Sequence, residues 1–152
     1  MRYYFFPEDI SVLEQMINGL YERIKELGKE QGKAAGQSTE NMGHDDACQE
    51  AVDQARRTTL GRLNDLGEIV GKAIVITRED IIGKGVFDSV RMGAIVELSD
   101  GRIFRIGSFM ILADHPIMNI SYNSPLARAL LNKKEGDEIG FQGQFFRIVC
   151  IR

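Results

Sequence analysis

The sequence predicts an α+β protein, in which an N-terminal antiparallel α-helical coiled coil precedes a small β-sheet domain with one short helix. The hydrophobic pattern has a helical period up to residue 71 and becomes strand-like from residue 72 onward. The composition is that of a folded chain, because 43% of the 152 residues are hydrophobic and the net charge is only −3. We therefore expect two domains, residues 1–71 and residues 72–152.

The first predicted helix carries a hydrophobic seam whose steps alternate between three and four residues, as in a coiled coil. The seam is formed by Ile10, Leu13, Ile17, Leu20, Ile24 and Leu27. Pro7 followed by Glu8 and Asp9 suits the start of this helix, since acidic residues favour the positive N-terminal end. Residues 36–43, GQSTENMG, predict the turn that follows.

A second apolar stripe follows this turn, again in steps of three or four residues. It is formed by Cys48, Val52, Ala55, Thr59, Leu63, Leu66 and Val70. Each helix is apolar on one side only, so the nearest partner for each stripe is the other helix, running antiparallel. Arms of about 25 residues, at about 1.5 Å per residue, would project on the order of 35–40 Å. The alternative is that the pair folds back as half of a larger bundle.

From Lys72 onward, short β-branched and aromatic runs alternate with Gly and Asp-Gly turns. The Asp-Gly pair at residues 100–101 predicts a hairpin. One helix is predicted at residues 124–134, with Ser124 as N-cap, Pro125 at the first helical position, two lysines in the last turn and a glycine after it. The predicted strand runs are KAIVITRE (72–79), GAIVELSDGRIFRIG (93–107) and GFQGQFFRIVCIR (140–152).

Charge divides at the same boundary. Residues 1–71 hold 8 Lys and Arg against 13 Asp and Glu, a net charge of −5. Residues 72–152 hold 11 against 9, a net charge of +2. The predicted tip of the coiled coil, residues 36–50, carries four acids and neither Lys nor Arg. These acids are Glu40, Asp45, Asp46 and Glu50.

The acidic tip has two interpretations. Asp45, Asp46 and Glu50 could hold a hard cation such as Mg²⁺, which prefers oxygen ligands. Alternatively, they cap the second helix, because acids complement a helix N-terminus and Asp46 with Gln49 resembles a capping box. An isolated tip would bind Mg²⁺ weakly, so a functional site would need ligands from a partner.

Several other functions are disfavoured. A weakly acidic chain is not a bulk nucleic-acid binder, and no apolar run approaches the roughly 20 residues of a membrane span. Cys48 and Cys150 form neither a disulfide framework nor a zinc site. Gly83-Lys84-Gly85 predicts a turn rather than a phosphate loop, and with only His44 and His115, the latter in a predicted loop, few histidine-dependent mechanisms can be built. We expect a soluble, cytoplasmic monomer without a secretory signal.

Residues 120–139, ISYNSPLARALLNKKEGDEI, resemble the C-terminal signature of the GreA and GreB transcript-cleavage factors, which are bacterial transcription elongation factors. The resemblance spans most of residues 72–152 and implies an FKBP-like fold there, combined with an N-terminal antiparallel coiled coil. It also implies docking on RNA polymerase at the rim of its secondary channel, through a loop formed by Asn123, Ser124 and Pro125.

The same resemblance gives the tip a role beside the polymerase active site. In the family, tip acids help to position Mg²⁺ and a water for hydrolysis of a phosphodiester in backtracked nascent RNA, as in two-metal phosphoryl chemistry. Asp45 and Asp46 are therefore the candidate catalytic and metal-positioning residues. The Mg²⁺ would be shared with the polymerase, so the chain would be an accessory factor rather than an enzyme, reaching RNA only through the polymerase.

The tip departs from the family pattern G-D-x-x-E-N-A-E-Y. Aligning E-N-A with Asp45-Asp46-Ala47 places Met42 where the first Asp stands, and a second alignment places His44 there. One functional acid is then missing, although a neighbouring acid could take its place. The alternative within the family is a cleavage-inactive regulator that blocks the channel. Alternatives outside it are a stand-alone FKBP-like enzyme, such as a prolyl isomerase, and a coiled-coil adaptor.

Overall fold

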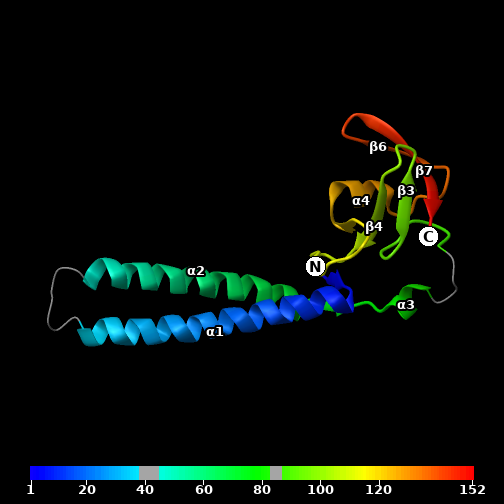
Figure 1. Ribbon diagram of the computed structural model, residues 1–152. Coiled ribbons are helices and arrows are strands. Elements are labelled where there is room, and N and C mark those ends of the chain that lie inside the picture. Colours follow the sequence, from blue (N-terminus) through cyan, green and yellow to red (C-terminus); the bar gives the residue numbers. More distant parts are fainter. Residues whose placement is uncertain (38–44, 83–86) are drawn as a thin grey trace. The chain divides into compact units, whose positions relative to one another are not determined.

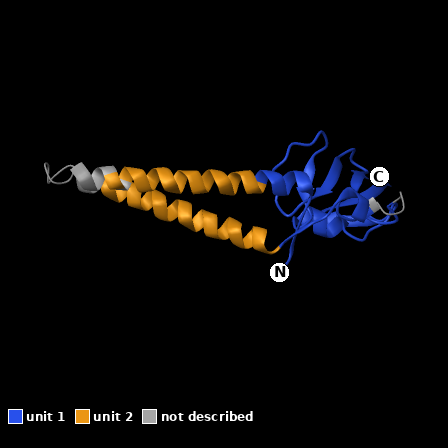
Figure 2. Ribbon diagram, turned by 90° about the horizontal axis from the view of Figure 1, so that it is seen from below, with its two compact units in different colours: residues 1–12, 73–152 blue, residues 13–72 orange. Residues whose placement is uncertain are grey.

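The computed structural model describes residues 1–37, 45–82 and 87–152, without the side chains at 31, 33–37, 45–46 and 82. The chain divides into two compact units (Figure 2): unit 1 comprises Met1–Val12 and Ala73–Arg152, and unit 2 comprises Leu13–Lys72. The boundary at Lys72 lies close to the predicted one. The first twelve residues, however, belong to unit 1 and not to the coiled coil.

Unit 2 is built from most of two long helices, α1 (Pro7–Gln37) and α2 (Asp45–Gly71). They run antiparallel beside each other (Figures 1 and 2). The buried seam positions among the described residues of unit 2 are leucines: Leu13, Leu27, Leu63 and Leu66. The other helices in the described ranges have five and six residues, so no further long helix there could complete a bundle.

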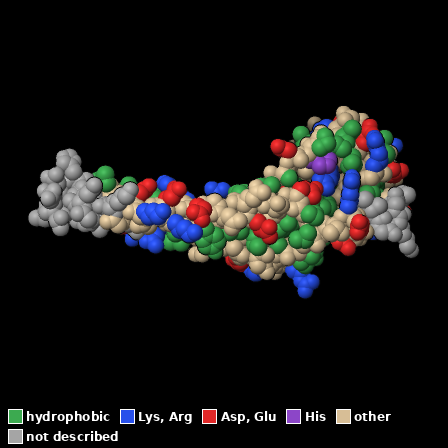
Figure 3. Space-filling model, turned by 60° about the horizontal axis from the view of Figure 1, so that its bottom comes forward, with side chains coloured by type: hydrophobic (Ala, Val, Ile, Leu, Met, Phe, Trp, Pro, Cys, Tyr) green, Lys and Arg blue, Asp and Glu red, His purple; other side chains and the backbone are tan. Residues whose placement is uncertain are grey.

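The solvent faces of these helices carry mixed charges, as Figure 3 shows along unit 2. Arg23 pairs with Glu26 at 3.4 Å, and Lys25 pairs with Glu22 at 3.0 Å. Cys48, predicted on the seam, is exposed instead. A regular spacing of apolar residues shows which face of a helix is apolar, but it does not show which part of that face another helix buries. Within the described residues, no helix combines the length and apolarity that crossing a membrane requires.

The first residues join unit 1 because they form a strand. Strand β1 (Tyr3–Phe5) pairs in parallel with β2 (Ala73–Val75). The aromatic run continues into the interior of the unit, where Phe5 is 0% and Phe6 2% exposed. A two-helix seam offers no pocket for rings of this size, whereas a sheet and its loops can surround them.

The main element of unit 1 is a five-stranded sheet with the strand order β5-β4-β3-β7-β6. Its strands are β3 (Ile95–Leu98), β4 (Ile103–Gly107), β5 (Asn119–Ser121), β6 (Glu138–Phe141) and β7 (Gln144–Ile151). Within this five-stranded sheet, β4 and β5 pair in parallel and the other neighbours pair antiparallel. The predicted hairpin at 100–101 joins β3 to β4, with Gly101 in a left-handed conformation (φ +85°) that suits a residue without a Cβ.

The core of unit 1 lies between one face of this sheet and helix α4 (Pro125–Leu130), seen beside β4 in Figure 1. The alternation along the strands sends every second side chain into it. Its members are Val90, Ala94, Val96, Leu98, Phe104, Ile106, Leu126, Ala127, Leu130, Ile139, Ile148 and Ile151. The α+β prediction is confirmed.

Helix α4 ends earlier than predicted, at Leu130, so Lys133 and Lys134 do not form its last turn. Asn132 takes a left-handed conformation (φ +64°) and donates its N–H to the Val90 carbonyl at 2.8 Å. The Val90 N–H in turn donates to Lys133 at 2.8 Å. An asparagine in a left-handed conformation directly after the C-cap is a common way for a helix to end, and the pairing with the distant Val90 accompanies that end.

The predicted strand run at 72–79 is a strand only over β2, after which helix α3 (Arg78–Ile82) begins. The Thr77 and Asp80 side chains cap this helix reciprocally. The Thr77 N–H and hydroxyl donate to Asp80 Oδ2 at 2.9 and 2.7 Å, and the Asp80 N–H donates to Thr77 Oγ1 at 3.3 Å. The turn predicted at 83–85 lies outside the described residues.

Candidate functional site

The loop between β5 and α4 holds the three predicted docking residues, which the structure brings together at the start of α4. Ser124 is the N-cap of α4: its backbone is extended (φ −67°, ψ 152°) and its Oγ accepts the Ala127 N–H at 3.3 Å. Pro125 takes the first helical position, where its missing N–H leaves nothing unpaired. Pro125 is exposed, while Asn123 and Ser124 are half-buried. The cap thus fixes the shape of the loop that presents these residues.

Two polar side chains, one before the loop in the sequence and one after it, form hydrogen bonds with Asn123. The Ser121 hydroxyl accepts the Asn123 N–H at 3.2 Å and donates to the Phe109 carbonyl at 2.8 Å. The Arg128 guanidinium, which is exposed, donates to Asn123 Oδ1. The loop and the first turns of α4 therefore carry an amide paired with a cation, and an exposed proline ring. Such a mixed polar and apolar surface is typical of protein–protein contacts.

A cluster of aromatic rings packs around Tyr122, the residue directly before the docking loop. The Tyr122 ring lies 6.0 Å from that of Tyr4, edge to face, and 6.3 Å from that of Phe109. The Tyr122 hydroxyl accepts the Tyr4 N–H at 3.2 Å. The Phe109 ring contacts Tyr3 at 4.5 Å between centroids. Strand β1 is therefore part of the support of the loop, a role that its position at the start of the chain gave no reason to predict.

The predicted tip residues cannot be placed in the same way. Helix α2 begins at Asp45, but the side chains of Asp45 and Asp46 are outside the description, as are Met42 and His44. Among the described side chains, no group of three His, Cys, Asp or Glu could hold a metal ion. The Mg²⁺ and capping interpretations of the tip both stay predictions.

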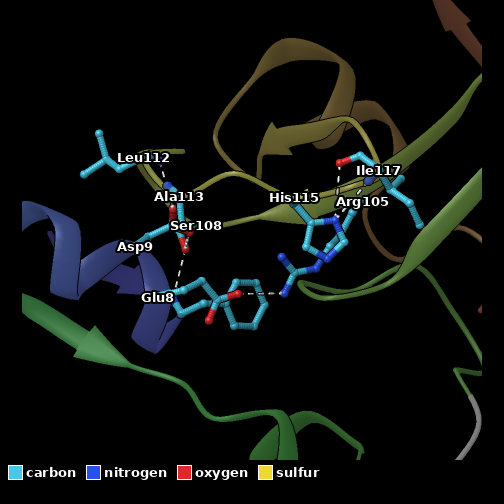
Figure 4. Close-up of polar contacts among 9 residues, drawn as sticks. Glu8, Asp9, Arg105, Ser108, Leu112, Ala113, His115 and Ile117 are labelled. Atoms are coloured by element: carbon cyan, nitrogen blue, oxygen red, sulfur yellow. Dashed lines mark hydrogen bonds and ion pairs between the residues drawn. The ribbon is translucent and has the colours of Figure 1, made fainter.

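A buried carboxylate that sequence reasoning missed lies elsewhere in unit 1 (Figure 4). The sequence predicts that Asp9 complements the helix dipole at the start of α1, yet its side chain is only 1% exposed. Its Oδ1 accepts the N–H groups of Leu112 and Ala113 at 2.8 and 2.9 Å, and its Oδ2 accepts the Ser108 hydroxyl at 2.5 Å. A signal existed: Asp9 lies four residues before the buried Leu13 and so shares its helix face.

A second polar group adjoins this carboxylate (Figure 4). Arg105 is 8% exposed, pairs with Glu8 at 3.3 Å and lies 4.4 Å from the centre of the Phe6 ring. His115 lies in the loop between β4 and β5, as predicted, and its Nδ1 accepts the Ile117 N–H at 3.1 Å. Together these contacts fix the start of α1 and the loop after β4 in unit 1.

Comparison with known proteins connects this geometry to one family. Residues 84–145 match the family described as "Transcription elongation factor, GreA/GreB, C-term". The matched segment contains the docking loop and α4, and it does not reach the tip. The loop is therefore the candidate site that the comparison covers.

Two curated relatives extend the match beyond this segment. Transcription elongation factor GreA of Alkaliphilus oremlandii is 36% identical over 125 residues, which are 80% of this chain and 70% of that protein. GreA of Bartonella tribocorum is 32% identical over 113 residues, 72% of this chain and 66% of that protein. The chain thus spans about two thirds of the length of these relatives.

A solved structure aligns over the whole chain. It is GreA factor homolog 1 (Gfh1) of Thermus thermophilus, with 23% identity over 100% of this chain and 99% of that one, at a TM-score of 0.46. A score this low carries no argument about the arrangement of the units or about function.

Proposed function

Since this chain belongs to the GreA/GreB family of transcription elongation factors, we propose that it binds RNA polymerase and modulates elongation from the secondary channel. Unit 1 docks at the rim of the channel, and unit 2 carries its tip toward the active site. The observation that carries the proposal is the docking loop, which lies in the family-matched segment and is held in one conformation by the cap of α4. On this proposal the protein acts in the cytoplasm, as a monomer.

The contacts of the loop favour a protein partner. A preformed loop loses little conformational entropy on binding, because Ser124 and Ser121 already fix its backbone. Pro125 offers an exposed apolar ring, and Asn123 and Arg128 offer polar groups next to it. Arginine beside an apolar anchor is a common composition at binding hot spots.

We assign the tip acids Asp45 and Asp46 to the polymerase active site. Carboxylate oxygens are the ligands that Mg²⁺ prefers, and a metal ion there stabilises developing charge and activates water in phosphodiester hydrolysis. The chemistry belongs to the polymerase, so this chain acts as an accessory factor. Asp45 and Asp46 contribute negative charge that favours retention of the metal ion while the complex persists.

One observation favours a second candidate function, a regulator that occupies the channel without stimulating cleavage. Met42 takes the place of a family acid in the first alignment of the tip. A thioether is a weak ligand for Mg²⁺, which is a hard cation. A tip with one acid fewer would hold the metal ion less well and would mainly obstruct the channel.

A cleavage assay on backtracked elongation complexes tests both candidates. Added protein releases short 3′ RNA fragments if it stimulates cleavage, and the Asp45→Ala/Asp46→Ala variant then releases fewer. If wild type releases none but displaces a known channel binder, the channel-blocking function holds instead. Absence of both cleavage and competition would contradict the proposed function.

A further inference from the structure

We propose that Asp9 and Ser108 are positioning residues that connect the docking loop to helix α1, and through that helix to the tip. This inference rests on the proposed function. Asp9 and Ser108 lie about a hundred residues apart in the sequence, |i−j| = 99, and neither is on the docking surface. The connection runs through residues 107–113, the end of β4 and the loop after it.

The first half of the connection joins this segment to the first turn of α1 (Figure 4). Both carboxylate oxygens of Asp9 are used: Oδ1 accepts from the N–H groups of Leu112 and Ala113, and Oδ2 accepts from Ser108. Ser108, 0% exposed, accepts the Phe6 N–H at 2.8 Å through the same oxygen. Four hydrogen bonds thus converge where strand β1 becomes helix α1.

The second half joins the same segment to Ser121 and Tyr122, the two residues directly before the docking loop. The Phe109 N–H donates to the Tyr4 carbonyl at 2.9 Å, and the Phe109 carbonyl accepts from Ser121 at 2.8 Å. The Tyr122 N–H donates to the Gly107 carbonyl at 3.2 Å. The space here is filled: a Cβ on Gly107 would lie 2.5 Å from Cδ1 of Ile111. One segment therefore contacts the start of α1 and also Ser121, whose hydroxyl in turn accepts the Asn123 N–H of the docking loop.

The chemistry of the contact favours positioning over stability alone. A leucine at position 9 would bury more apolar surface on the same helix face, but apolar contact is not directional. Hydrogen bonds from two successive N–H groups and a hydroxyl are directional, so they specify the angle as well as the distance of the first turn. Asp9 lies in the first turn of α1, which runs from Pro7 to Gln37, so these bonds act on the direction in which the helix starts.

A titration against RNA polymerase elongation complexes separates docking from positioning. Ser108→Ala removes the hydroxyl between Asp9 and Phe6, and Ser99→Ala is the matched control, because Ser99 Oγ also accepts a distant N–H, that of Arg147 at 3.0 Å. We expect Ser108→Ala to reduce the maximal effect on transcription about fivefold or more. The half-effect concentration should stay within about twofold of wild type, and Ser99→Ala should change neither quantity. Equal changes in both variants, or a loss of affinity alone in Ser108→Ala, would overturn the inference.

A second measurement uses the free full-length chain and does not depend on the polymerase. Spin labels are placed on the exposed Cys48 and on Lys133→Cys in a Cys150→Ser background, and the distance distribution between them is recorded. Ser108→Ala and the isosteric Asp9→Asn should broaden the distribution, whereas Ser99→Ala should not. A role in stability alone would lower the melting temperature without broadening. Unchanged distributions in both anchor variants would overturn the inference even if wild type acts on the polymerase, and a wild type without any effect on transcription would instead refute the proposed function.

Discussion

Hydrogen bonds in unit 1 join residues about a hundred positions apart, such as Asp9 and Ser108, whereas the ion pairs along unit 2 join residues three to seven positions apart. Unit 1 supports its docking loop by a local cap at Ser124 and also by distant contacts, such as the Tyr4 N–H donated to the Tyr122 hydroxyl, which only the complete fold creates. Unit 2 repeats one local pattern along two helices. The difference matches the proposed roles, since a docking surface needs a fixed shape and a reaching element needs mainly length and a continuous seam.

The largest contrast should come from core truncation. Ile148 is 0% exposed in the sheet of unit 1, and Leu20 is a half-buried seam residue of unit 2. We expect Ile148→Ala to lower the free energy of unfolding of unit 1 by about 2–5 kcal/mol, and Leu20→Ala to lower that of unit 2 by about 1 kcal/mol. Amide hydrogen exchange resolved by residue measures both. Equal losses would contradict the contrast between a surrounded core and a two-helix seam.

The cap beneath the docking loop should have a smaller effect. Ser124→Ala removes the oxygen that accepts the Ala127 N–H, at an expected loss of about 1 kcal/mol in the stability of unit 1. Ser124→Gly is the matched control and should lose only about a few tenths of a kcal/mol, since glycine is tolerated at this position. Chemical denaturation compares the two. An alanine variant as stable as the glycine variant would show that the hydroxyl does not hold the loop.

Ion pairs on unit 2 should contribute less again. Arg23 pairs with Glu26 at 3.4 Å and approaches Glu30 at 4.0 Å, with all three side chains at least half exposed. Arg23→Ala should lower helix stability by about 0.2–0.5 kcal/mol at low salt, and the difference should shrink at about 1 M salt as screening increases. Circular dichroism during thermal unfolding at both salt concentrations tests this. A loss that does not depend on salt would assign the effect to packing of the arginine stem.

The smallest effect concerns pH and the cap of α3. Hydrogen bonds from the Thr77 hydroxyl, and then from its backbone N–H, hold the pKa of Asp80 below the ordinary value for an aspartate. A carboxyl with a depressed pKa contributes stability above its unfolded-state pKa, and this contribution is lost as the pH falls through the lowered value. Thr77→Val should move the pKa of Asp80 back toward its ordinary value in a carboxyl NMR titration. An unchanged titration would show that the hydroxyl does not act on Asp80.

The same contrast explains what the sequence could predict. The helical seams, the hairpin at residues 100–101 and the Ser124 cap each depend on residues within a few positions of one another. The structure confirms them, except that Cys48 is exposed. The local rules for helix caps also predicted the conformation of part of the docking loop, because Ser124 is the N-cap of α4 and Pro125 takes its first position.

Local rules could not predict the features that depend on distant partners. Strand β1 pairs with β2, about 70 residues away in the sequence, so the aromatic run at the start of the chain could not be assigned to unit 1 from its neighbours alone. The end of α4 is set by Val90, and the burial of Asp9 by Ser108. An acid near a helix start is normally assigned to the dipole, and only its place on the face of Leu13 hinted at burial.

If unit 1 docks on RNA polymerase through the loop before α4, equilibrium binding of the full chain to core polymerase should depend on that loop. Pro125→Ala should leave the fold intact, because alanine is a good helix former at the first position. Pro116→Ala is the matched control, since Pro116 is also an exposed proline of unit 1. We expect about tenfold weaker binding for Pro125→Ala, which corresponds to about 1.4 kcal/mol, and unchanged binding for Pro116→Ala. Equal affinities for the two variants would contradict docking through this loop.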